Sequence, residues 1–141
     1  MTATPLIVDA SVAMKWLVEE ADTGAAIALL VRDLAAPALL RVEVANALRT
    51  AVGKGAIARV RAMALLDRLH AAPMAVLGTD DALERRALEI ALDLGHPVYD
   101  CVYLALAERT GRLLITADAR FLRALARSPH AARATALADA A

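Results

Sequence analysis

Short apolar runs alternate with longer stretches of helical periodicity along the chain, and this alternation limits the possible folds more than any other feature. Runs of strand type lie at 6–8, 35–40, 73–77 and 113–115, and helical stretches separate them. Short buried strands that alternate with helices are typical of a mainly parallel sheet with helices on both faces. We therefore expect an α/β fold, with residues 1–141 forming a single domain around one core.

The element boundaries follow from apolar spacing and from turn residues. Helices are expected at 12–18, 25–31, 42–52, 57–69, 81–94, 101–109 and 121–126. Pro37 is expected at the start of the second strand, where its missing N–H does least harm. Asp80 or Asp81 suits the N-cap of the helix that Gly95 follows. Residues 133–137 are expected to add a short edge strand.

The sequence also gives expectations about location. No apolar run approaches the roughly 20 residues needed to span a bilayer, and the opening MTATPLIVDAS has no signal-peptide pattern. The single cysteine, Cys101, cannot form an intramolecular disulfide, which favours a reducing compartment. We therefore expect a cytoplasmic protein with no membrane association.

The formal net charge is zero, but the charges are unevenly spread. The charged residues within 41–68 and within 109–133 are mostly basic, whereas those within 80–108 are mostly acidic. One interpretation is ordinary solvated helix surfaces. The other is a basic surface beside an acidic pocket, as an enzyme that acts on nucleic acid needs. Charge alone leaves both open.

Four acids stand at the ends of expected elements: Asp9, Glu43, Asp100 and Asp118. Each has a structural explanation when taken singly. Asp9, Asp100 and Asp118 could cap the helices that follow them, with Ser11 as a competing cap for the first. Glu43 could interact favourably with the dipole at the start of a helix. However, Glu43 and Asn46 share one helical face beside Val and Ala, which is unusual for a solvated surface.

Taken together, the four acids suggest a metal site. Asp9 and Asp118 follow apolar strands, and the ends of strands and helices in a parallel sheet converge on one edge. Carboxylates gathered there repel one another, and a divalent cation relieves that repulsion. Oxygen ligands favour Mg²⁺ or Mn²⁺ over zinc. Neutral polar groups close by in sequence are supplied by Ser11, Asn46 and Thr116.

Four segments resemble the PIN-domain endoribonucleases, in particular the VapC-like toxins of type II toxin–antitoxin pairs. They are LIVDASVAMKWL, RVEVANAL, YDCVYLALAERTG and LLITADARF, which together extend over nearly the whole chain. The last two are the most specific, with their acids, Asp100 and Asp118, 18 positions apart. The resemblance implies a PIN-like three-layer α/β/α domain with a central, mainly parallel sheet of four to five short strands.

The resemblance also implies which residues form the site. The acidic quartet of the family falls on Asp9, Glu43, Asp100 and Asp118, and its hydroxyl-bearing positions fall on Ser11 and Thr116. Asn46 matches a frequent polar position. The implied activity is Mg²⁺-dependent hydrolysis of RNA phosphodiester bonds, with Mn²⁺ as a substitute, by a toxin that inhibits translation or growth. The acids bind the metal, and Glu43 either ligates it or orients the attacking water.

The implied partners are RNA, a cognate antitoxin, a second copy of the chain and a higher hetero-oligomer with the antitoxin. Contact with DNA is expected only through the antitoxin. RNA needs basic residues around the acids, and the candidates are Arg41, Arg49, Lys54 and the arginine-rich end of the chain. Tyr99 and Tyr103 could stack on bases, but core packing is the preferred interpretation.

The remaining candidates are given structural roles. His70, His96 and His130 have no ligand spacing among them and are expected at the surface or in loops. Trp16 is expected to anchor the core or an interface. Two alternatives to the nuclease stay open: a non-catalytic PIN-fold binding module, and a Mg²⁺-dependent phosphoacceptor domain. The second fits poorly, because the third strand does not end at an acid.

Overall fold

The centre of the protein is a five-stranded parallel sheet. The structure is a computed structural model that describes residues 3–140. The strand order is β3–β2–β1–β4–β5, and every neighbouring pair is parallel. The strands are β1 (Leu6–Val8), β2 (Leu34–Pro37), β3 (Ala75–Leu77), β4 (Leu113–Thr116) and β5 (Ala134–Ala136). The expected parallel sheet and its C-terminal edge strand are confirmed; Met1, Thr2 and Ala141 of the predicted domain lie outside the described residues.

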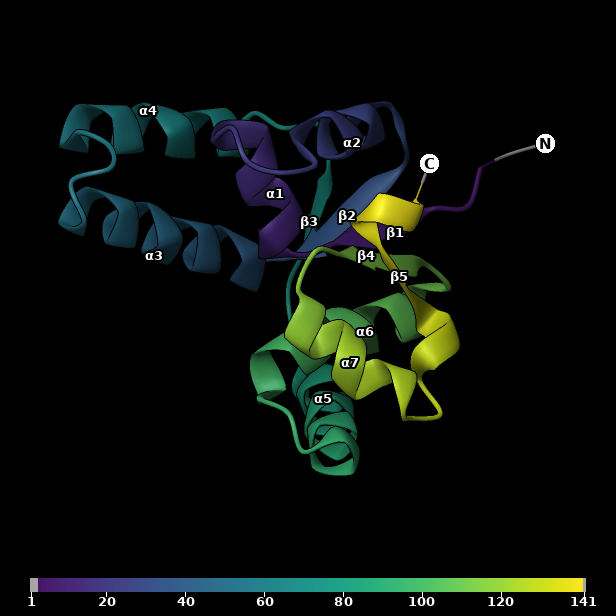
Figure 1. The fold of residues 1–141 in the computed structure, drawn as a ribbon. Coiled ribbons are helices and arrows are strands. Elements are labelled where there is room, and N and C mark those ends of the chain that lie inside the picture. Colours follow the sequence, from purple (N-terminus) through teal and green to yellow (C-terminus); the bar gives the residue numbers. More distant parts are fainter. Residues whose placement is uncertain (1–2, 141) are drawn as a thin grey trace.

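Helices cover both faces of the sheet, which gives the three expected layers (Figure 1). The helices of one side are α1 (Ala10–Leu17), α2 (Thr23–Ala28), α3 (Leu39–Gly53) and α4 (Arg59–His70). The other side holds α5 (Asp81–Leu94), α6 (Val98–Thr110) and α7 (Ala119–Ala126). Short 3-10 turns are η1 (Leu29–Val31), η2 (Ala131–Arg133) and η3 (Leu137–Asp139). Helices α3 and α4 pack on each other and project beyond the sheet (Figure 1).

The buried apolar residues form one core cluster with members on both faces of the sheet, and α6 is its most completely buried helix. All residues from Cys101 to Ala107 are buried, which agrees with the uninterrupted apolar run CVYLALA. A helix that is apolar on all sides must be buried on all sides. Helix α6 contacts β1, β2 and β4, so it crosses the middle of the sheet. Trp16 is also buried and donates its indole N–H to the Ala26 carbonyl at 2.8 Å, which confirms its expected core position.

The strand order places a switch point between β1 and β4. The chain runs from β1 outward to β2 and β3, and then returns to the other side of β1 to form β4 and β5. Ligands of open parallel sheets bind outside the carboxyl ends of the strands at such a point. Asp9 directly follows β1, and Asp118 lies two residues after the end of β4.

Two expected boundaries are wrong. Pro37 ends β2 instead of starting it, and Leu39 and Leu40 already belong to α3. Proline has no N–H for the ladder, so the pairing continues through the Ala38 N–H, which donates to the Leu77 carbonyl at 2.8 Å. Leu40 is buried as a residue of α3 and not as part of a strand.

The sixth helix begins at Val98, three residues before the expected Cys101, with Pro97 at its N-cap. Proline suits a helix start because its ring fixes φ and its missing N–H would have no partner there. Asp100 is therefore the third residue of α6 and does not cap it, which corrects one interpretation of this acid. None of the helices within residues 3–140 is long and apolar enough to cross a membrane.

Candidate active site

Asp9 is a buried carboxylate at the centre of the switch point. Its side chain belongs to a residue only 4% exposed, and it caps α1 by accepting the Val12 N–H at 3.3 Å. The same oxygen, Oδ1, accepts the Ser11 hydroxyl at 2.5 Å, and Oδ2 accepts the Thr116 hydroxyl at 2.5 Å. Strands β1 and β4 pair with Val8 opposite Ile115, so the residues that follow them are neighbours.

The environment of Asp9 opposes its ionisation. Burial raises the pKa of this carboxyl to about 6, and the negative charge of Asp100 adds to the rise. The hydrogen bonds from Ser11, Thr116 and Val12 act in the opposite direction but do not cancel the burial. A nearby cation would stabilise the ionised form of Asp9 in this buried position.

Glu43 and Asp100 form the second part of the site. Burial raises the pKa of the half-buried Glu43, a hydrogen bond from Tyr103 lowers it, and the Asp100 charge raises it further. The Tyr103 hydroxyl donates to Glu43 Oε1, which joins α6 to α3. Burial and the neighbouring acids raise the pKa of Tyr103, so the phenol stays a donor. Core packing was the preferred interpretation of Tyr103, and its ring is buried; its contact with an acid was not foreseen.

His96 is a polar neighbour of Asp100 that the sequence did not reveal. Its Nε2 lies 2.6 Å from Asp100 Oδ2, and its side chain is only 7% exposed. The imidazole packs on the Phe121 ring, with 5.0 Å between the centroids. His96 lies in the loop between α5 and α6, as one of the two expected positions, but its side chain is not at the surface. The only signal was its position four residues before Asp100, which gains meaning once α6 is known to start at Val98.

Asp118 lies on the β4 side and caps α7, as one interpretation expected. Its Oδ1 accepts the N–H groups of Arg120 at 3.0 Å and Phe121 at 3.2 Å. Its own N–H donates to the Thr116 hydroxyl oxygen at 3.1 Å, which ties its backbone to the Asp9 network. Within residues 3–140, no hydrogen bond joins the Asp118 carboxylate to the other three acids.

The three neutral polar candidates have different positions. Ser11 and Thr116 both bond to Asp9, and the Ser11 oxygen also accepts the Ala117 N–H at 2.9 Å. Asn46 is exposed, and its side chain makes no hydrogen bond within the described part of the chain. Hydrogen bonds thus join Ser11 and Thr116 to Asp9, and the role predicted for Asn46 stays a prediction.

The donors fit a divalent cation that prefers oxygen. The charge of Asp100 raises the pKa of both Asp9 and Glu43, so Asp100 lies close enough to each of these two acids to repel it. Carboxylate oxygens are the ligands of Mg²⁺ and Mn²⁺, which commonly keep several waters and take substrate oxygens as further ligands. Between residues 3 and 140, no group of three or more His, Cys, Asp or Glu side chains already surrounds one metal position.

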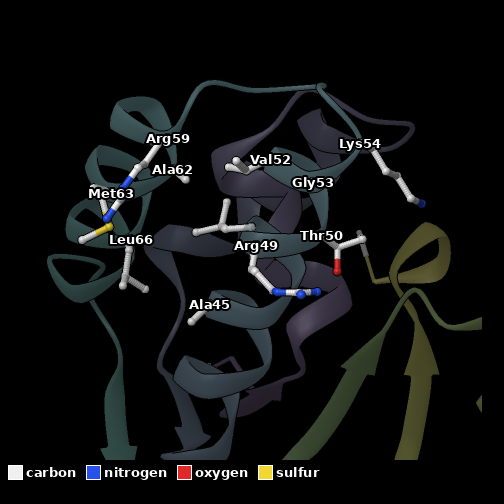
Figure 2. Close-up of a pocket in the computed structure, with 11 residues that line it drawn as sticks. Ala45, Arg49, Thr50, Val52, Gly53, Lys54, Arg59, Ala62, Met63 and Leu66 are labelled. Carbon is white, nitrogen blue, oxygen red and sulfur yellow. The ribbon is translucent and has the colours of Figure 1, made fainter.

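A separate hollow lies between α3 and α4 and has a volume of about 660 Å³. Figure 2 shows Arg49, Lys54 and Arg59 among its mainly apolar lining, with Met63 and Leu66 on the α4 side. None of its lining residues is acidic, so it lacks the carboxylate oxygens that a divalent cation prefers. The carboxyl edge of the sheet, where the acids lie, is therefore a better candidate for a cation site than this hollow.

Comparison with solved structures supports the fold. The chain is 26% identical to PAE2754 of Pyrobaculum aerophilum, with a TM-score of 0.68 over 86% of this chain and 79% of that one. It is 18% identical to VapC20 of Mycobacterium tuberculosis, described as a sarcin–ricin loop cleaving toxin, with a TM-score of 0.66 over 84% and 94% of the two chains. VapBC2 of Rickettsia felis, solved with a DNA fragment of its promoter, matches at 11% identity and a TM-score of 0.67 over 93% and 97%.

No curated protein matches the chain in sequence. The family model of the PIN domain, in contrast, matches residues 6–127, which include all four candidate acids and extend from β1 through α7. The match agrees with the parallel sheet, its strand order and its helices on both faces. The chain belongs to the PIN domain family.

Proposed function

We propose that this protein is a Mg²⁺-dependent endoribonuclease, with Mn²⁺ as a substitute, and the toxin of a toxin–antitoxin pair. The observation that carries the proposal is the placement of buried Asp9 and half-buried Glu43 near the charge of Asp100, beside the switch point of a PIN domain. Carboxylates held close together in a partly buried position lower the stability of the fold. Proteins keep such destabilising groups where they are needed for binding or catalysis. When bound, a divalent ion would activate water for attack on phosphorus and offset charge on the phosphate oxygens.

The residues of the site divide the work. Asp9, Asp100, Asp118 and Glu43 are the proposed metal-binding and catalytic acids. Ser11 and Thr116 hold the two oxygens of Asp9 in fixed directions, and Tyr103 does the same for Glu43. His96 is proposed as a positioning residue, because it fixes one oxygen of Asp100 from a buried site. Asn46, exposed on α3, is proposed to meet substrate or metal-bound water only in the complex.

The toxin assignment rests on the solved neighbours. VapC20 is described as a toxin that cleaves the sarcin–ricin loop, and VapBC2 as a complex bound to promoter DNA. By analogy we propose that residues 1–141 act as one domain in the cytoplasm, inhibit translation or growth, and bind an antitoxin. A homodimer, a higher assembly with the antitoxin, and DNA contact only through that antitoxin complete the proposal. Arg41, Arg49 and Lys54 remain candidate RNA contacts, since all three are exposed.

The test is cleavage of total cellular RNA by the purified, antitoxin-free protein with Mg²⁺, with Mn²⁺ and with chelator. We expect discrete fragments with either metal, none with chelator, and at least a hundredfold slower cleavage by Asp100→Asn, since losing one electrostatic group costs about that much. Asp67→Asn is the matched control, because it makes the same change at an exposed position on α4.

An equal loss in both variants would point to a folding defect, whereas cleavage that persists in Asp100→Asn or in chelator would contradict the proposed site. The alternative of a non-catalytic binding module has its own signature. It predicts that folded protein binds RNA in the presence of Mg²⁺ and cleaves none of it. That outcome would remove the enzyme from the proposal and leave the family assignment intact.

A further inference from the structure

A second hollow, of about 600 Å³, lies between the turn that joins α5 to α6 and the helix α7. Its lining includes His96 and Pro97 on one side, and Arg120, Arg123 and Arg127 on the other. Both α6 and α7 lie on the same side of the sheet (Figure 1). The hollow thus lies next to the start of α6, which carries Asp100, and along α7, which Asp118 caps, but none of the four acids belongs to its lining.

The hollow is basic. Arg120, Arg123 and Arg127 are all exposed, and their spacing of three and four residues places them along one face of α7. Within residues 3–140 their guanidinium groups make no ion pair and no hydrogen bond. Other arginines of the chain are paired, as Arg86 is with Glu108 and Arg109 with Asp80.

One acid, Asp93, also lines the hollow, and it lies 3.7 Å from the His130 Nε2. Three guanidinium groups against this carboxylate leave an excess of positive charge. Like charges three and four residues apart repel each other along a helix. An anion placed among them would relieve this repulsion, as the acids of the switch point would gain from a cation.

The hollow adjoins the candidate active site through two shared residues. His96 lines it and also contacts Asp100 Oδ2 at 2.6 Å. Arg120 lines it and donates its backbone N–H to Asp118 Oδ1 at 3.0 Å. A nucleic-acid strand whose scissile phosphate sits at the acids therefore has a basic hollow directly beside it.

We infer that this hollow binds the backbone phosphate of the RNA strand next to the scissile bond. The inference rests on the proposed nuclease function and adds to it the path of the substrate. Guanidinium groups match phosphate oxygens in charge and in geometry. Contacts of this kind fix the register of the strand and carry no sequence information, so the hollow positions the RNA and does not select its sequence.

The test compares wild-type protein with the double variant Arg123→Ala, Arg127→Ala. Arg120 is left in place because it adjoins the Asp118 cap. We expect the Kd for a short single-stranded RNA to rise about tenfold, and the slope of log Kd against log salt to shrink by about 0.7 for each phosphate that the variant no longer binds. In cleavage, KM rises by the same factor while kcat is unchanged, because the interaction with phosphate is equal in the ground and transition states.

Arg85→Ala is the matched control, since Arg85 is exposed on α5, has no ion-pair partner among the described residues and does not line the hollow. It should leave the Kd, the salt slope and the kinetics unchanged. Thermal unfolding of the double variant should match wild type or exceed it, because the removed charges repel each other. If the melting temperature of the double variant falls instead, its loss of RNA binding is explained by unfolding and the inference fails.

Two outcomes would overturn the inference without touching the proposed function. One is a double variant that binds and cleaves RNA as wild type does. The other is a pair of results: inorganic phosphate raises the melting temperature of the wild type but not of the variant, while both proteins bind RNA equally well. That pair would assign the hollow to a free anion. Wild-type protein that neither binds nor cleaves any RNA would instead remove the proposed function itself.

Discussion

Asp9→Asn should make the metal-free protein more stable at neutral pH. Burial raises the pKa of Asp9 from 3.8 to about 6, so the folded state binds this proton more tightly than the unfolded state does. The free energy of unfolding must then fall as the pH rises through the window from 3.8 to about 6. The rise in pKa corresponds to about 3 kcal/mol, which ionised Asp9 costs the fold at pH 7.

The asparagine should recover most of this cost. Its oxygen can still accept from Ser11 and Val12, which both bond to Oδ1 of Asp9. Its NH₂ group replaces Oδ2, so the Thr116 hydroxyl must turn from donor to acceptor. That rearrangement costs about 1 kcal/mol, which leaves a net gain of about 2 kcal/mol at pH 7. Well below pH 3.8 wild-type Asp9 is protonated in both states, so the gain should vanish there and the variant should be less stable by the cost of the rearrangement, about 1 kcal/mol.

The assay is urea unfolding of both proteins in chelator, at matched protein concentration, at several values of pH from 3 to 8. Added Mg²⁺ should stabilise the wild type more than the variant and so narrow the difference at pH 7. Asp67→Asn, at an exposed position on α4, is the control and should show no pH-dependent difference. A variant that is less stable than wild type at pH 7, or a difference that does not change with pH, would refute the reasoning.

Three further substitutions separate the roles of residues in the site. Tyr103→Phe keeps the buried ring but removes the donor to Glu43, so we expect a loss of about 1 kcal/mol in urea unfolding and a lower kcat in RNA cleavage. His96→Ala should lower kcat at unchanged KM, and His96→Gln should restore part of it by again donating to Asp100; equal losses in both would deny His96 a positioning role. Asp118→Ala should lower stability by about 1 kcal/mol through the lost α7 cap, whereas Asp118→Asn should keep the cap and lose only cleavage, which thermal unfolding and RNA digestion can separate.

The parts of the fold that were predicted correctly depend on local patterns. The apolar runs of β1 and β4 and the switch to helical spacing after them are enough to indicate a parallel sheet, and the structure has one. Asp118 as an N-cap was also readable, because an acid directly before a helical stretch is a common cap. The family match over residues 6–127 confirms the resemblance seen in four short segments.

The misses concern boundaries and distant contacts. Moving the start of α6 from Cys101 to Val98 changes Asp100 from a cap to a first-turn residue and brings His96 within reach of it. The hydrogen bond from Tyr103 to Glu43 joins residues 60 positions apart, and nothing in either segment alone indicates it. Such contacts depend on how two helices pack on the sheet, which spacing within one helix does not specify.

The Thr116–Asp9 hydrogen bond has a consequence for how the protein is made. Its two residues are 107 positions apart, and they meet only when β4 lies beside β1. During synthesis, β1 and α1 leave the ribosome long before β4 does. Neither the supporting hydroxyl of Thr116 nor the acid at position 118 exists while the first part of the chain emerges. A nascent chain that lacks these residues has no complete set of the four acids, so translation must pass residue 118 before the acidic site can form.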